Sequence, residues 1–131
     1  ALRMGCLFSQ AGNIAFLRKG QSPYSVNAVA AAAASVAVDD QAYIRKYVGE
    51  VLAAKELLYV QLERFQIEYV RSQGNFVLIY AGERAPEVCE ELRNRGILVR
   101  NRSHEIPGTV RITVGTRDQV RQLIDAMEEF W

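Results

Sequence analysis

The sequence predicts an α/β fold, in which a small mixed β-sheet is covered by helices on one side to form a two-layer sandwich. Residues 75–131 alternate between short apolar runs typical of strands and apolar spacings of three and four typical of helices. Their order is strand, helix, strand, strand, helix, and two longer helical segments precede them. The chain has 131 residues, enough to bury one hydrophobic core without disulfide bonds.

The first residues differ in character from the rest. Leu2–Phe8 is predicted to be a strand that starts without a cap or a turn before it, and Asn13–Lys19 a short helix. Pro23 then interrupts the chain, because a proline disfavours the helical conformation in the residue before it. A domain rarely begins within a strand. We therefore interpret residues 1–22 as the tail of another structure and residues 23–131 as the domain that carries the sheet.

Two helices are predicted before the sheet. Ser25 or Asn27 can cap the first, which continues through the alanine-rich segment Ala28–Val38. Asp39 and Asp40 can cap the second, which is predicted at Gln41–Tyr69 because apolar residues recur there at intervals of three and four. These apolar residues are Ile44, Val48, Val51, Leu58, Leu62, Phe65 and Tyr69. Such a stripe fits a helix that buries one face, and it does not fit a strand.

Local signals place a central strand and the helices around it. Asn75–Ala81 is an uninterrupted apolar run, which predicts a strand buried on both faces at the centre of the sheet. Ala85–Arg95 is predicted to be a helix that ends at Gly96, since glycine adopts the left-handed conformation of a helix stop without strain. Thr116 is expected to open the last helix through a capping box with Gln119.

Two further strands, Ile97–Asn101 and Thr109–Val114, each carry an arginine among apolar residues. Alternation along the strands places Arg100 and Arg111 on the faces opposite to the apolar residues beside them. A guanidinium can bind a carboxylate or a phosphate through two parallel hydrogen bonds. Two of them on neighbouring strands suggest a site for a doubly anionic small molecule. The alternative is that both arginines only solvate the exposed face of a half-buried sheet.

The composition excludes several classes of partner. Sixteen basic and fifteen acidic residues leave a net charge of +1, and no aromatic residues are interleaved with basic ones as in a nucleic-acid groove. We therefore expect no nucleic-acid partner. No apolar run approaches the length of a membrane span and no signal peptide is visible, so we expect no membrane partner and a cytoplasmic location. Cys6 and Cys89 stand alone and are predicted to be small buried hydrophobes in a reducing compartment.

The chain carries no motif for self-sufficient catalysis. His104 is the only histidine, so neither a histidine-based triad nor a histidine-rich metal site can form, and no metal is expected. The lysines are Lys19, Lys46 and Lys55, and none lies in a strand-to-loop context suited to a buried Schiff base.

Several segments resemble class II, fold type I pyridoxal-phosphate aminotransferases, and in particular histidinol-phosphate aminotransferase. They are ALRMG at the start, PYSVN before the alanine-rich helix, NFVLIY, and above all GILVR followed by RITVGT. The resemblance covers essentially the whole chain and corresponds to the carboxy-terminal third of that family. It implies that residues 1–22 are a remnant of the large cofactor-binding domain. It also implies that residues 23–131 are the carboxy-terminal small domain.

The resemblance implies a function as well. The family converts histidinol phosphate and 2-oxoglutarate to imidazole-acetol phosphate and glutamate in histidine biosynthesis, with pyridoxal 5'-phosphate as the cofactor. Carried over by motif, Arg111 pairs with the substrate α-carboxylate, and Arg100 holds the substrate phosphate or the second carboxylate of glutamate. Arg3, in the LRMG segment, contacts the phosphate of the cofactor. The implied partners are a phosphorylated amino acid or amino alcohol, a 2-oxo acid, and a second copy of the enzyme in a homodimer.

The family's Schiff-base lysine lies upstream of Ala1 by this resemblance, so no catalytic residue is expected within the chain, and the chain alone is expected to be inactive. Two alternatives stand beside this interpretation. One is the same domain from a related threonine-phosphate decarboxylase, and the other is a free-standing anion-binding regulatory module. The intact RITVGT segment favours the aminotransferase, and the start within a strand argues against an independent module.

Overall fold

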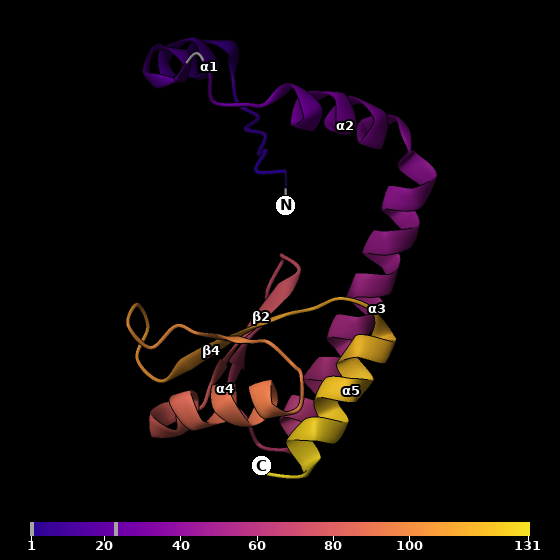
Figure 1. Cartoon of the computed structure of the whole chain (residues 1–131), viewed down its shortest axis with the longest axis vertical. Helices are drawn as coiled ribbons and strands as arrows, with labels where there is room; N and C mark the ends of the chain where they lie inside the picture. The colour runs from indigo at the N-terminus through magenta and orange to yellow at the C-terminus, as the bar shows by residue number, and fades with distance from the viewer. Residues whose placement is uncertain (1, 23) are drawn as a thin grey trace. The chain divides into compact units, whose positions relative to one another are not determined.

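The computed structural model describes residues 2–22 and 24–131 (Figure 1). The chain forms two compact units, one ending at Arg45 and the other comprising Lys46–Trp131. This division reflects contacts within each unit. The predicted assignment of residues up to 22 to a different domain is a separate matter and stays a prediction.

The amino-terminal unit contains two short helices and the start of a third. Helix α1 spans Ala11–Leu17 and continues as the 3-10 turn η1 (Arg18–Gly20), which confirms the short helix predicted in this region. Helix α2 spans Ala28–Asp39 and is capped by Asn27, whose side-chain oxygen accepts a hydrogen bond from Ala30 N at 2.8 Å. One of the two predicted caps is therefore confirmed.

The predicted strand at Leu2–Phe8 is wrong. Residues 2–10 form neither helix nor strand. A strand needs a neighbour to satisfy its backbone hydrogen bonds, and none of the described residues supplies one to this segment. The predicted break at Pro23 lies outside the described residues.

Helix α3 spans Gln41–Arg64 and ends earlier than predicted. The backbone of Gln66 is left-handed, with a φ of 58°. The amide of Ile67 donates to the carbonyl of Leu62 at 2.8 Å, which closes the helix end. A left-handed residue other than glycine leaves no clear signal in the sequence, so the apolar pattern alone could not locate this stop. The chain then enters strand β1 (Tyr69–Val70), so Tyr69, predicted as the last residue of the helix, belongs to a strand.

The sheet has four strands in the order β1-β2-β4-β3, and all neighbours are antiparallel. β2 spans Phe76–Tyr80, β3 Arg100–Asn101 and β4 Thr109–Thr113. The prediction of a mixed sheet is wrong in this respect. Helix α4 (Ala85–Asn94) does connect the two parallel strands β2 and β3. However, β4 lies between them and pairs with both, so no parallel pair forms among the described strands.

Strand β3 is shorter than the predicted Ile97–Asn101, because only its last two residues pair with β4. The residues before them separate from β4 and leave a hollow of about 400 Å³. Segment 96–99 lines one side of this hollow, and residues 112–115 line the other. Ile97 and Val99 pack against the hydrophobic core, so their apolar character reflects burial without strand pairing.

Three helices cover one face of the sheet in the carboxy-terminal unit: α4, α5 (Arg117–Glu128) and the second half of α3 (Figure 1). Their apolar residues and one face of the sheet form a single core, which confirms the two-layer sandwich. The strand residues of this core are Val77, Ile79, Val110 and Ile112, which are at most 2% exposed. The main helix residues are Val51, Leu58, Leu62, Val88, Leu92, Val120, Leu123, Ile124 and Met127.

Local signals fix the ends of α4 and α5 as the sequence predicts. Gly96 follows α4 with a φ of 78°, in the left-handed region that favours glycine. Thr116 and Gln119 form the predicted capping box at the start of α5.

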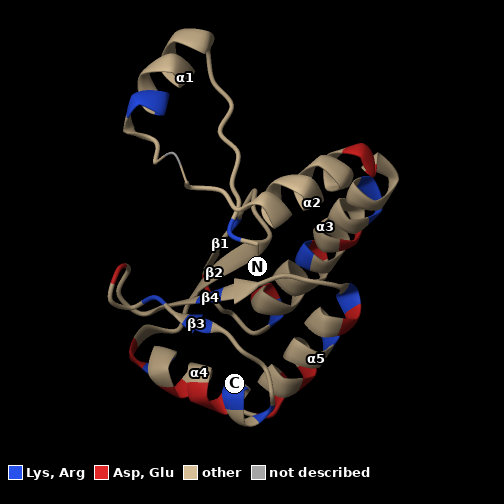
Figure 2. Cartoon of the chain, turned by 45° about the horizontal axis from the view of Figure 1, so that its top comes forward, with Lys and Arg blue, Asp and Glu red and all other residues tan. Residues whose placement is uncertain are grey.

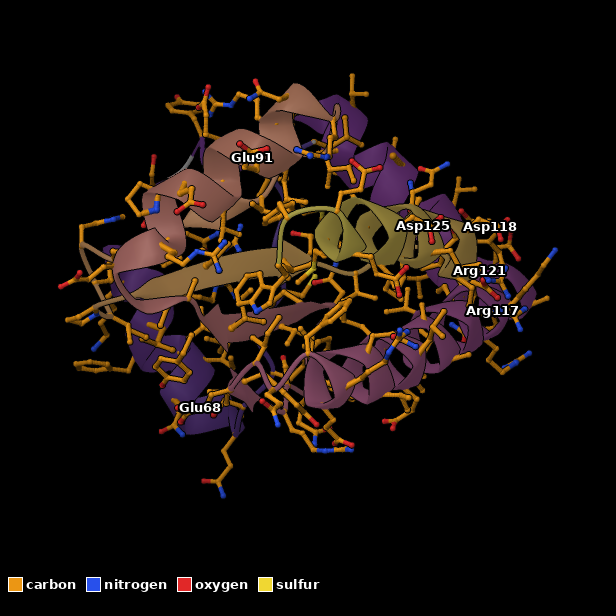
Figure 3. The ribbon with its side chains drawn as sticks, turned by 90° about the horizontal axis from the view of Figure 1, so that it is seen from below. Glu68, Glu91, Arg117, Asp118, Arg121 and Asp125 are labelled. Carbon is orange, nitrogen blue, oxygen red and sulfur yellow. The ribbon has the colours of Figure 1, made fainter. Side chains whose placement is uncertain are left out.

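An ion pair ties the start of α5 to α3. The backbone N–H and the guanidinium of Arg117 donate to Glu50 Oε1 at 2.9 and 3.1 Å. The hydrogen bond from the guanidinium lowers the pKa of Glu50 from its ordinary value. Figure 3 shows Arg117 near Asp118 and Arg121 at this end of α5, where Arg121 pairs with Asp118 at 2.7 Å. Charged side chains therefore complete the apolar contact between the two helices.

The second face of the sheet is only half-buried, in contrast to the prediction that β2 is buried on both faces. Leu78 and Tyr80 are partly exposed and Phe76 is 39% exposed, since the helices of this unit lie on the opposite face. β2 is nevertheless interior in the sheet, as predicted, because β1 and β4 pair with its two edges.

Candidate functional site

Two arginines stand directly opposite each other on the half-buried face of the sheet. Arg100 of β3 and Arg111 of β4 are register partners, and paired residues of antiparallel strands project to the same face. Arg111 is also the partner of Leu78, which pairs with Val70 of β1. A row of two apolar and two cationic residues therefore crosses all four strands. Figure 2 shows basic residues on the adjacent strands β3 and β4. The prediction that the two arginines lie on neighbouring strands is confirmed, whereas their ligands stay predictions.

These two arginines lack the carboxylate partners that most arginines of this unit have. Among the described residues, neither Arg100 nor Arg111 forms an ion pair, and neither does the exposed Arg93 on α4. The arginines that do pair with a carboxylate are Arg64, Arg71, Arg84, Arg95, Arg102, Arg117 and Arg121. Like charges placed directly opposite on two strands destabilise a sheet. An anion bound between Arg100 and Arg111 would reverse this effect.

The surroundings of Arg111 leave part of its hydrogen-bonding capacity unused. Its Nε atom is shielded from solvent and has no hydrogen-bond partner among the described residues. The ring of Phe76 lies beside the guanidinium, with its centroid 5.8 Å from Cζ. Shielding a donor without an acceptor costs roughly 1–3 kcal/mol, and more when the group is charged. A buried polar group without a partner calls for an explanation, and a catalytic role or a bound ion is among those known.

The loop after β3 holds its own charges in place. Arg102 pairs with Glu105, and its backbone N–H donates to the carbonyl of Thr109 at 2.9 Å. His104 is exposed and lies 3.5 Å from Glu105. His104 is therefore a solvated loop residue. Arg102 and His104 both lie near a carboxylate, whereas Arg100 and Arg111 have no carboxylate partner among the described residues.

Arg3, the third predicted site residue, belongs to the amino-terminal unit. Its side chain is exposed and forms no ion pair with any described residue. Its backbone has a φ of 60°, which is uncommon for a residue other than glycine. The structure thus leaves its guanidinium available to an anion, and its contact with a cofactor phosphate stays a prediction.

The structural role of Lys55 was not predicted from the sequence. This lysine is 4% exposed, and its ammonium donates to the carbonyls of Ser72 and Gly74, the latter at 3.1 Å. A signal was available, because Lys55 falls between Val51 and Leu58 on the apolar stripe of α3. Its ammonium holds the turn between β1 and β2.

Other kinds of site find no support in the described part of the chain. No group of three or more histidine, cysteine or acidic side chains gathers there as around a metal ion. Burial raises the pKa of the Cys89 thiol, which makes it a poor nucleophile. Cys6 is exposed, in contrast to its prediction as a buried residue. The described helices also include none that is long and apolar enough to cross a bilayer.

Comparison with known proteins assigns the fold and the family. The family model "Aminotransferase class I and II" matches residues 1–127. Histidinol-phosphate aminotransferase 1 of Carboxydothermus hydrogenoformans is 34% identical over 128 residues, which make up 98% of this chain and 37% of the relative. This chain therefore spans about a third of the length of the curated relatives that it matches.

Two solved structures share the fold at lower sequence identity. The histidinol-phosphate aminotransferase from Clostridium acetobutylicum superposes with a TM-score of 0.74 at 19% identity, over 88% of this chain and 36% of that one. L-threonine-O-3-phosphate decarboxylase from Porphyromonas gingivalis gives a TM-score of 0.66 at 23% identity, over 93% of this chain and 39% of that one. Together with the family match over nearly all residues, this likeness leads to one conclusion: the chain belongs to the class I and II aminotransferase family.

Proposed function

We propose that this chain is the substrate-binding part of an aminotransferase that acts on a phosphorylated amino acid or amino alcohol, such as histidinol phosphate, with a 2-oxo acid as amino acceptor. The single observation that carries the proposal is the register pair of Arg100 and Arg111, two guanidinium groups on one face without carboxylate partners in the described chain. The names of the relatives support the substrate class, since the first relative is a histidinol-phosphate aminotransferase.

The two arginines divide the anionic groups of the substrate between them. Arg111, which is half-buried and fixed beside Phe76, suits the α-carboxylate that every amino-acid substrate presents in one place. Arg100 is exposed at the edge strand, so its side chain can adapt to a phosphate or to the second carboxylate of glutamate. Glutamate and 2-oxoglutarate, which carry two carboxylates, can therefore engage both arginines, whereas histidinol phosphate has a single anionic group, its phosphate, for Arg100 to hold.

The family is generally dependent on pyridoxal phosphate, which supplies an electron sink to the reacting carbon when it is bound. The residues of this chain fit only part of that cofactor's needs. Arg3 has a free guanidinium that suits a phosphate. Lys55 is occupied by two carbonyls, and Lys19 and Lys46 are exposed on η1 and α3. We therefore keep the proposal that the Schiff-base lysine comes from outside residues 1–131 and that this chain alone is inactive.

A second candidate is a threonine-phosphate decarboxylase-like enzyme, favoured by the likeness to the Porphyromonas gingivalis structure. Its lower TM-score makes it the weaker of the two. A carboxylate and a phosphate on one substrate would also suit the arginine pair, so the site does not separate these reactions. The products do, because a decarboxylase releases carbon dioxide, whereas the aminotransferase converts 2-oxoglutarate to glutamate and releases none. A free-standing regulatory module has no support from the family match.

A chimaeric enzyme tests the proposal. Residues 1–131 would replace the matching third of the Carboxydothermus hydrogenoformans relative, and transamination between histidinol phosphate and 2-oxoglutarate would be measured. Arg111→Ala should reduce kcat/KM by the equivalent of about 2–4 kcal/mol, since it removes a charge-assisted bidentate contact. Arg100→Ala should impair phosphorylated substrates more than unphosphorylated ones, and Arg93→Ala is the matched control. Near-normal efficiency of the Arg111→Ala chimaera with glutamate would refute the assignment.

A further inference from the structure

Phe76 is the aromatic neighbour of the candidate carboxylate arginine. It pairs with Thr113, so it lies diagonally across from Arg111 on the same face of the sheet. Its ring centroid is 5.8 Å from the Arg111 Cζ atom, within the range in which a guanidinium is attracted to an aromatic ring. Phe76 is 39% exposed, so burial in the core does not explain why a large aromatic residue stands at this position.

The shielded Nε atom of Arg111 gives this contact a consequence for binding. Nε is shielded from solvent and has no acceptor among the described residues. A ligand carboxylate must therefore meet Arg111 through the two terminal nitrogens. The direction in which these nitrogens point depends on the orientation of the guanidinium, which the ring beside it restricts.

The turn before β2 provides the space for the ring. A Cβ atom added at Gly74 would lie 3.0 and 3.2 Å from two carbon atoms of the Phe76 ring. The φ of Gly74 is not in the left-handed region, so the close approach of the ring, and not the backbone conformation, is what favours glycine here. A larger residue at this position would shift the ring.

A buried lysine fixes the same turn. The Lys55 ammonium donates to the carbonyls of Ser72 and Gly74, and the Gly74 N–H donates to Ser72 Oγ at 3.0 Å. No carboxylate lies within ion-pair distance of Lys55 in the described chain, so the two carbonyls are what retain this charge in the interior. The turn thus has one well-defined conformation, and the position of Phe76 follows from it.

We propose that Phe76 is a positioning residue, which orients the Arg111 guanidinium so that its terminal nitrogens face an incoming carboxylate. This inference rests on the proposed function, in which Arg111 binds the substrate carboxylate. It extends that function by assigning part of the carboxylate affinity to a residue that need not touch the substrate. The Ser72–Gly74 turn and Lys55 support Phe76 in this role.

Nitrogen NMR of the arginine side chains in the 131-residue chain tests the proposal. In the unmodified chain, the Arg111 Nε–H should exchange slowly with solvent, because Nε is shielded. Phe76→Leu should speed this exchange and should leave the Arg100 signal unchanged. Phe76→Tyr keeps the ring and should restore slow exchange. Tyr80→Leu is the matched control. Tyr80 lies as far along β2 from the Leu78–Arg111 pair as Phe76 does, and it has no described ring contact with Arg111.

Titration with glutarate adds a second measurement. Phe76→Leu should weaken glutarate binding about two- to five-fold, in line with the loss of one partly exposed cation–π contact, while Tyr80→Leu and Phe76→Tyr should bind as the unmodified chain does. Unchanged Arg111 exchange in Phe76→Leu would overturn the positioning role, and so would equal effects of Phe76→Leu and Tyr80→Leu. Absence of glutarate binding to the unmodified chain would contradict the proposed function instead, and the exchange measurement would still decide the role of Phe76.

Discussion

The two faces of the sheet are built from the same strands and serve opposite purposes. On the inner face, Val77, Ile79, Val110 and Ile112 are almost completely buried under three helices. On the outer face, the alternate positions hold two arginines in register, and most of the residues around them are half-buried or exposed, although Thr109 is buried. One face gains stability from each residue, whereas the other places like charges opposite each other at a cost of roughly 0.2–1 kcal/mol.

Residues that stabilise the fold and residues proposed to bind the ligand therefore alternate along the same strands. The inner positions tolerate only apolar side chains of suitable volume, because the interior is closely packed. The outer positions carry groups that do not improve the stability of the ligand-free chain, and such groups persist where function requires them. Substitutions on the two faces should therefore have different effects, and this provides direct tests of the comparison.

The largest expected effect is on the inner face. Ile112→Ala should lower the free energy of unfolding of the chain by about 2–5 kcal/mol, because it removes buried methylene groups and leaves a cavity. Leu78→Ala on the outer face should cost clearly less, since Leu78 is only half-buried. Denaturant unfolding of the two variants measures both changes. Equal losses would mean that the outer face is packed as tightly as the inner one.

A smaller effect is expected where the covering helices end. Gly96→Ala should lower stability by about 1 kcal/mol, because alanine disfavours a positive φ. An added Cβ there meets nothing within 4 Å, so the cost comes from the backbone conformation alone. Gln66→Gly at the end of α3 should raise stability, since Gln66 has the same left-handed conformation without being glycine. Thermal unfolding of the two variants should shift in opposite directions.

These two helix ends also show which parts of the fold can be predicted from the sequence. Gly96 and the capping box of Thr116 have local signals, and both predictions about them are confirmed. Both arginine strands are also found, although only Arg100–Asn101 of the predicted Ile97–Asn101 pairs as a strand. The stop at Gln66 and the insertion of β4 between β2 and β3 depend on contacts between distant segments. The periodicity of a single strand or helix does not encode such contacts. The order of the strands and the existence of β1 could therefore not be predicted from the sequence.

The candidate site likewise combines features that local sequence patterns predict with features that depend on contacts between distant segments. The arginine strands predict that two guanidinium groups are neighbours, because alternation and the short loop between the strands are local properties. The contact of Phe76 with Arg111 depends on strand register, and the bonds of Lys55 depend on how α3 packs against the β1–β2 turn. Both required the three-dimensional arrangement.

On the outer face, Arg111→Leu should leave stability unchanged or raise it by about 0.2–1 kcal/mol, because it removes a like-charge pair and an unsatisfied donor. The same change should abolish anion binding. Unfolding in denaturant, with Arg93→Leu as the control for a general change in charge, measures the first part. A clear loss of stability would mean that Arg111 belongs to the structural framework.

The smallest effect concerns the exposed ion pair between α3 and α5. Arg117 lowers the pKa of Glu50 in the folded chain. This pair therefore stabilises the fold at pH values above 4.5, the ordinary pKa of a glutamate. That contribution should be lost as the pH falls through the lowered pKa of the folded state. Glu50→Gln should therefore reduce stability near neutral pH and make unfolding less sensitive to acid. If the free energies of unfolding of the unmodified chain and of Glu50→Gln change in parallel from neutral to acidic pH, this coupling is contradicted.

The most direct test of the account is a calorimetric titration of the 131-residue chain with glutarate, a small dicarboxylate without other functional groups. If Arg100 and Arg111 form a site for two anionic groups, binding should be saturable with one site per chain and should weaken as salt is added. Arg100→Ala and Arg111→Ala should each reduce it strongly, whereas Arg93→Ala should bind as the unmodified chain does. Glutarate binding of equal strength in all four proteins would contradict the account, and so would the absence of binding in the unmodified chain.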